Sequence, residues 1–201
     1  MEKIKYISLN FLLLLLSSNY IECQLIKFGS AKGLFMDLGV GPRVPVGDNS
    51  IMENLGTGVQ VTFSYSDNEF LPIFLYGSVG HQHNPGRQNF YGGSDYSAYS
   101  VNLIYLNAGV RYYFSPIVEN VVILMPIIEG GINWGYFIKQ HEFKLDRYRN
   151  DYIEETQKFG FHIGGGFSMF LLDVVVYYNH YYNNEYISID LRIRLPIYVS
   201  I

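Results

Sequence analysis

Cysteine is almost absent from this chain of 201 residues, and charged residues are scarce. The single cysteine, Cys23, ends an N-terminal leader, so the remainder of the chain offers neither a disulfide pair nor a thiol nucleophile. Charged residues make up 16% of the chain, below the roughly 25% of typical soluble domains. The net charge of −4 argues against a nucleic-acid surface, which needs clustered Lys and Arg. The sequence also lacks an apolar run of about 18 residues, so it predicts no ordinary transmembrane helix.

What the chain has in abundance is Tyr and Gly, with 19 and 20 copies, and 17% of its residues are aromatic. Its last segment, Ile187 to Val199, alternates strictly between aliphatic and mostly polar residues. Such a period of two places the two sets on opposite faces of a β-strand. The polar face carries charges of both signs, which is unlike the dry core of a sandwich. The segment is typical of a barrel with an apolar outside and a polar inside.

The first 23 residues read as a secretory signal peptide. Lys3 and Lys5 give a basic start, and Ile7 to Leu16 forms an apolar core that is too short to span a bilayer. We expect cleavage after Cys23, which leaves residues 24–201 as one β-barrel domain.

Seven further segments show strand character and alternate with loops and turns. They cover residues 34–43, 57–65, 70–83, 99–114, 121–137, 158–170 and 173–182, with long loops at 44–54, 84–98 and 139–156. Asn183-Asn184 suits a two-residue hairpin turn because Asn tolerates a positive φ. That turn pairs Tyr182 with Glu185, and Tyr178 with Ile189. Eight strands follow, and an even number leaves both termini at the end with the short turns.

One face of these strands collects charged residues and glycines, and it must turn inward if the barrel lies in a membrane. The charged residues can then pair inside, which supports the barrel and leaves it too full to conduct solutes. A narrow gated pore stays open as an alternative. The predicted interior polar network consists of Asp37, Arg111, Glu129, His162, Asp190, Arg192 and Arg194.

The first strand, G-L-F-M-D-L-G-V-G-P-R, and the fourth, A-G-V-R-Y-Y-F, resemble those of small outer-membrane β-barrels of the OmpA/OmpX type. The resemblance covers about Ile26 to Ile201. It implies an all-β, eight-stranded, antiparallel up-and-down transmembrane barrel that is monomeric and lies in the outer membrane. It also implies contact with outer-membrane lipid, lipopolysaccharide and the barrel assembly machinery. Such barrels usually end on an aromatic residue, whereas this chain ends on Ile201 and has its last aromatic at Tyr198.

The loops and histidines supply the remaining site candidates. Phe90, Tyr91, Tyr96 and Tyr99 are interleaved with Gly and Ser, a composition shared by adaptable binding surfaces. His81, His83, His141 and His180 fall near the long-loop rim, but no carboxylate or cysteine spacing supports a metal site. We therefore expect no metal and no cofactor.

The sequence carries no nucleophile-elbow, metalloprotease or phosphate-loop motif. We expect a non-catalytic barrel with a structural or surface-interaction role through its long loops. Two alternatives remain. One is a lipid-modifying barrel enzyme of the lipid A deacylase or acyltransferase kind, with His180, His141 and Ser97 or Ser100 brought together by the loops. The other is a soluble, lipocalin-like barrel that holds an apolar ligand.

Overall fold

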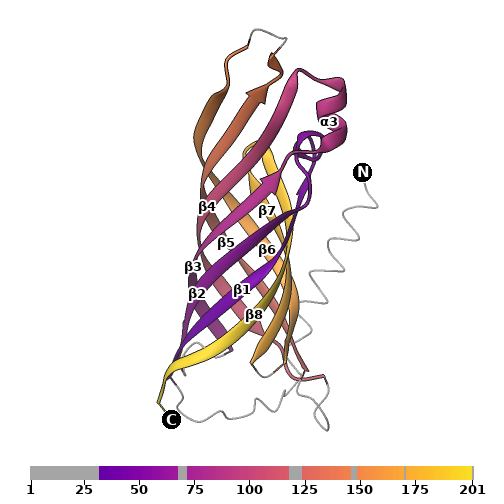
Figure 1. Ribbon diagram of the computed structural model, residues 1–201. Coiled ribbons are helices and arrows are strands. Elements are labelled where there is room, and N and C mark those ends of the chain that lie inside the picture. Colours follow the sequence, from indigo (N-terminus) through magenta and orange to yellow (C-terminus); the bar gives the residue numbers. More distant parts are fainter. Residues whose placement is uncertain (1–31, 68–71, 118–123, 146–148, 170, 201) are drawn as a thin grey trace, which may run out of the picture.

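The computed structural model describes residues 32–67, 72–117, 124–145, 149–169 and 171–200. Within them the chain forms one closed barrel in which each strand pairs antiparallel with the next and the last pairs with the first (Figure 1). The strands are β1 (Lys32–Val46), β2 (Gly56–Ser66), β3 (Ile73–Pro85), β4 (Tyr96–Tyr113), β5 (Leu124–Phe143), β6 (Tyr152–Met169), β7 (Leu172–Tyr181) and β8 (Asn184–Ser200). The predicted eight-stranded up-and-down barrel is confirmed. The predicted leader lies outside the described residues.

The alternation read from the sequence decides which side chains face outward. Every strand contributes large apolar residues to the outside, and those named below are between 37% and 77% exposed. They form a belt around the whole barrel: Leu38, Val40, Val44, Val59, Phe63, Tyr65, Ile73, Leu75, Val79, Ile104, Leu106, Val110, Tyr112, Ile128, Ile132, Phe159, Phe161, Ile163, Phe167, Val176, Ile189, Leu191, Ile193, Leu195 and Ile197. In β3, Leu75 and Val79 are exposed and Tyr76 is buried. No helix among the described residues is long and apolar enough to cross a membrane.

The interior is polar in its middle and aromatic toward both ends. Toward the short turns, Tyr113, Ile127, Val175 and Tyr177 form a small buried cluster. At the opposite end, which we call the mouth, a larger cluster of Tyr99, Val101, Leu103, Tyr105, Phe137, Tyr181 and Tyr186 fills the barrel. The side chains between these clusters are the functional candidates described below.

Three of the predicted loops are shorter or more ordered than expected. Most of the predicted loop 139–156 is strand, because β5 continues to Phe143 and β6 already begins at Tyr152. The β5–β6 hairpin therefore projects beyond the β7–β8 hairpin (Figure 1). The predicted loops 44–54 and 84–98 contain two short helices, α2 (Asn49–Met52) and α3 (Gln88–Gly93).

The predicted register of the last hairpin is wrong by two residues. Tyr181 pairs with Asn184, and Tyr178 pairs with Ile187 rather than with Ile189. The positive φ falls on Asn183, at 58°, so Tyr182 and Asn183 form the turn. Asn184 is wholly buried instead, and its side-chain oxygen accepts a hydrogen bond from Lys158. A shift of two residues keeps every side chain on its face, so the predicted outward set is unchanged.

Adjacent glycines in β6 give a matched pair for a packing test. A Cβ at Gly166 would lie 1.9 Å from the backbone oxygen of Val174, whereas one at Gly165 would lie 3.6 Å from the oxygen of Ile127. We expect Gly166→Ala to lower the free energy of unfolding by about 1–3 kcal/mol, because the backbone must move apart. Gly165→Ala should change it by less than about 0.5 kcal/mol. Denaturant titration of both variants checks this, and equal losses would contradict the described packing.

Candidate functional site

Six buried charged side chains form a closed ring across the middle of the barrel. The ring alternates in charge and runs through Arg111, Glu129, Arg192, Asp173, Arg194 and Asp37 before it returns to Arg111. Arg111 Nε lies 2.7 Å from Glu129 Oε1, and its Nη1 lies 2.8 Å from Asp37 Oδ2. Arg192 Nη2 lies 2.6 Å from Glu129 Oε1. Three arginines and three carboxylates balance, so the ring carries no net charge.

The ring joins strands that are far apart around the barrel. Asp37 lies on β1, Arg111 on β4 and Glu129 on β5, while the other members lie on β7 and β8. Arg192 and Arg194 are two residues apart, so they share the inward face of β8. Tyr177 supports Arg192, because its ring faces the guanidinium and its hydroxyl accepts a hydrogen bond from Arg192 Nη1 at 2.7 Å. The ring thus ties opposite walls of the barrel together.

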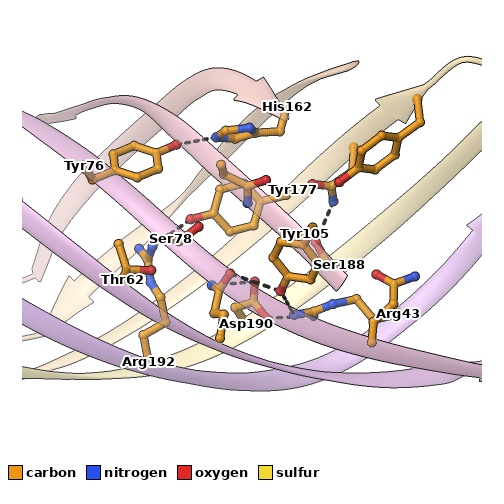
Figure 2. Close-up of a pocket in the computed structure, with 15 residues that line it drawn as sticks. Arg43, Thr62, Tyr76, Ser78, Tyr105, His162, Tyr177, Ser188, Asp190 and Arg192 are labelled. Atoms are coloured by element: carbon orange, nitrogen blue, oxygen red, sulfur yellow. Dashed lines mark hydrogen bonds and ion pairs between the residues drawn. The ribbon is translucent and has the colours of Figure 1, made fainter. Parts of the chain in front are cut away.

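A second ion pair lies between the ring and the mouth. Arg43 Nη1 is 2.7 Å from Asp190 Oδ1, and Arg43 also donates to the Tyr105 hydroxyl at 3.3 Å (Figure 2). Nearby, His162 has a hydrogen-bond partner at each ring nitrogen, Tyr76 on one side and Asn133 on the other.

The polar space that these side chains surround is small. It is a cavity of about 20 Å³ lined by Thr62, Ser78 and Ser188, among other polar residues (Figure 2). A cavity of roughly 10–15 Å³ holds one water molecule, so this one has no room for a solute.

All seven residues of the predicted interior network are buried in the barrel, and Asp37 and Glu129 both contact arginines. Asp190 pairs with Arg43, an arginine that is not among the seven. Asp173 was missed, although it bridges Arg192 and Arg194. The sequence pattern could have identified Asp173, because side chains alternate along a strand and the residue before outward-facing Val174 must point inward.

In the part of the chain that the structure describes, Glu53 is the one carboxylate buried in the mouth. It follows α2, and its backbone bridges to Gly86, so the β1–β2 and β3–β4 connections lie side by side. Tyr186 donates a hydrogen bond to Glu53 Oε2 at 3.0 Å, while Oε1 is buried without a hydrogen-bond partner. Burial raises the pKa of Glu53 from 4.5 to about 7, against the opposing effects of Tyr186 and of the positive charges of Lys139 and Lys158.

The aromatic residues predicted as a loop surface pack mainly against one another. Phe90 and Tyr91 belong to α3, and Tyr99 is only 5% exposed in the mouth cluster. Tyr96 lies between α3 and the mouth cluster, since its ring centre is 5.2 Å from that of Phe90 and 6.2 Å from that of Tyr99. Phe90, Tyr91 and Tyr96 remain half-buried at the rim of the mouth.

The four histidines weighed as metal ligands do not converge. His81 and His83 are exposed on the outside of β3, His141 is buried on β5, and His180 lies on β7 beside Glu185. No group of three or more His, Cys, Asp or Glu that could hold a metal ion occurs in the described part of the chain.

The residues considered for catalysis are brought together only in part, because His141 lies on β5 next to β4, where it pairs with Tyr99. Ser97 and Ser100 lie on β4, which is not a neighbour of the strand that carries His180. Ser100 donates to Gln140 and His180 contacts Glu185, so these described contacts do not form a nucleophile–base pair.

Comparison with known proteins yields structural similarity alone. No family model and no curated protein matches the sequence. Neisserial surface protein A is 14% identical, with a TM-score of 0.49 over 83% of this chain and 99% of its own. The attachment invasion locus protein Ail of Yersinia pestis is 12% identical, with a TM-score of 0.49 over 84% and 100% of the two chains. The outer-membrane enzyme PagL is 18% identical, with a TM-score of 0.45 over 81% and 99%.

Removal of one charge from the ring should be costly, because it leaves a buried arginine without a full set of partners. We expect Glu129→Gln to lower the free energy of unfolding by about 3–5 kcal/mol. The double variant Glu129→Gln with Arg111→Gln restores neutrality and should lose less than the sum of the two single variants. Urea titration in lipid vesicles measures the cycle. Strict additivity would show that the ring does not act as a unit.

The raised pKa of Glu53 predicts that the stability of the mouth depends on pH. The folded state holds the Glu53 proton more tightly than the unfolded state, so this stabilisation is complete below pH 4.5 and is lost as the pH rises through 7. We expect the docking of residues 47–55 to weaken by roughly 2–3 kcal/mol between pH 5 and pH 8. Hydrogen exchange of this segment measures the effect, after correction for the intrinsic pH dependence of exchange. Glu53→Gln should remove it, and an unchanged profile in that variant would assign the effect to another group.

Proposed function

We propose that this chain is an integral outer-membrane β-barrel with a closed polar interior and no catalytic role. The observation that supports this is the belt of exposed apolar side chains around the barrel, combined with the charged ring inside it. Soluble monomers rarely expose apolar patches larger than a few hundred Å². A lipid-embedded barrel shows this arrangement instead, because its backbone groups pair within the closed sheet and its outer side chains contact acyl chains.

In this proposal the short turns face the periplasm and the mouth faces outward, where lipopolysaccharide surrounds it. The assembly machinery inserts the chain after export through the leader. Because the ion pairs leave a cavity of only about 20 Å³, the barrel is a structural unit and not an open pore. The projecting β5–β6 hairpin and the rim around α3 then give the protein its contacts with other molecules at the cell surface.

The two alternatives make different predictions. A soluble lipocalin-like barrel needs an apolar interior, whereas the middle of this barrel holds charged side chains. A lipid-modifying enzyme would alter the acyl pattern of lipid A. The non-catalytic proposal predicts an unchanged pattern in a deletion strain, and a changed pattern would favour the enzyme.

Two arginine substitutions test the membrane placement. Leu106 lies in the apolar belt on β4 and is 49% exposed, whereas Ile153 lies on the projecting part of β6 and is 59% exposed. We expect Leu106→Arg to lower the free energy of unfolding in lipid vesicles by about 2–4 kcal/mol, and Ile153→Arg by at most about 1 kcal/mol. Equal small losses at both positions would contradict a lipid-facing belt.

A further inference from the structure

Two histidines share one exposed face of β3. His81 and His83 are two residues apart, and side chains alternate along a strand, so both point outward from the barrel. Both are exposed, whereas Gln82 between them is buried on the inner face. The Cα atoms of residues i and i+2 in a strand lie about 7 Å apart. Two imidazole rings at that spacing can lean toward each other and reach one ion.

The backbone that carries the two histidines is held by a strand on each side. Both residues pair with β2 on one side and with β4 on the other. Their partners, which share the outer face, are Thr57 and Val59 on β2 and Asn102 and Ile104 on β4. These four side chains are uncharged, so none of them repels a cation.

The inner side of the same strand is anchored inside the barrel. Gln82 Nε2 donates a hydrogen bond to Asn84 Oδ1 at 2.9 Å. Asn84 is wholly buried, and its Nδ2 donates to the backbone oxygens of Arg43 at 3.1 Å and of Asn54 at 3.0 Å. The histidines therefore stand on a fixed element, which a preorganised binding site requires.

Asn102 determines which nitrogen of His83 is free. His83 Nδ1 lies 2.9 Å from Asn102 Oδ1, and an amide oxygen only accepts hydrogen bonds, so Nδ1 carries the proton. Nε2 then keeps its lone pair. Histidines that bind metals almost always have the other ring nitrogen held in this way. The sequence predicted no metal site because it showed no carboxylate or cysteine nearby, whereas this orienting partner comes from the next strand.

The other three histidines of the described chain lack such an arrangement. His141 and His162 are buried. His180 Nδ1 lies 3.1 Å from Glu185 Oε1, so its ring is held in a comparable way. The residue two positions before it on β7 is Tyr178, however, and no second imidazole follows on β7. His180 is therefore a natural control for the pair on β3.

We propose that His81 and His83 bind one divalent transition-metal ion that prefers imidazole ligands, such as Zn²⁺ or Cu²⁺. Both histidines supply a ring nitrogen, and water fills the remaining coordination positions. Asn102 is a positioning residue that holds the ring of His83. The site lies two residues beyond Val79, at the edge of the apolar belt nearest the mouth. It adds a binding activity that the proposed structural role does not include.

Calorimetric titration of the full barrel with Zn²⁺, in a nonionic detergent without lipopolysaccharide, tests the site. We expect saturable binding of one ion per barrel. His81→Asn and His83→Asn each remove one of two attachment points and should weaken binding by about a hundredfold or more. Asn102→Ala keeps both imidazoles and should weaken it by about tenfold. Asn102→Asp restores the acceptor and should restore the affinity, and His180→Asn should leave it unchanged.

Electron paramagnetic resonance with Cu²⁺ counts the ligands independently of affinity. We expect coupling to two imidazole nitrogens in the unmodified barrel and to fewer in His81→Asn or His83→Asn. Unchanged binding in both variants, or an equal loss in His180→Asn, would overturn the proposal. Two ions per barrel, each held by one histidine, would overturn the shared site. Circular dichroism establishes first that each variant is folded, so failed binding by a folded barrel counts against the histidine pair and not against the proposed function.

Discussion

The interior of this barrel depends on the pairing of charges that are removed from water. Arg111 and Arg192 both reach Glu129, and the remaining members close the ring without excess charge. A single buried charge without a partner costs several kcal/mol, so the members of such a ring depend on one another. The glycines that share the inner face follow from the same constraint. Gly109 and Gly131 face each other across β4 and β5, and a Cβ at Gly109 would lie 2.9 Å from the Tyr76 hydroxyl, so the small residue leaves space for Tyr76.

The sequence alone predicted the fold well because one physical signal repeats in every strand. Alternation in Ile187–Val199 identifies the two faces, and charge identifies the inner one. The register of the last hairpin was predicted less well. A shift of two residues keeps every side chain on the same face, so the alternation cannot distinguish the two registers. The observed turn has its positive φ at Asn183. The ends of β5 and β6 were missed because the residues there, up to Phe143 and from Tyr152, are mostly polar and alternate weakly. The pairing of Asp173 with Arg192 and Arg194 depends on how the strands are arranged around the barrel. The periodicity of a single strand does not contain that information.

At the mouth end of the barrel the strand connections are ordered, whereas the sheet is not complete around the whole circumference. The β1–β2 and β3–β4 connections meet at Glu53 and Gly86, and the mouth cluster lies beneath them. Beside the mouth, β6 continues for several residues without a neighbouring strand on its β7 side in the described chain. The long loops that the sequence suggested as a binding surface are therefore largely self-contacting.

The proposed function depends on the orientation of the two faces, with apolar side chains in lipid and charges inside. Gel mobility of the membrane-extracted protein, with and without boiling in mild detergent, tests this most directly. Closed membrane barrels keep their backbone hydrogen bonds in detergent, so the unboiled protein should run apart from the boiled protein. A single mobility for both samples, with the protein recovered in the soluble fraction, would contradict the assigned faces and the function proposed from them.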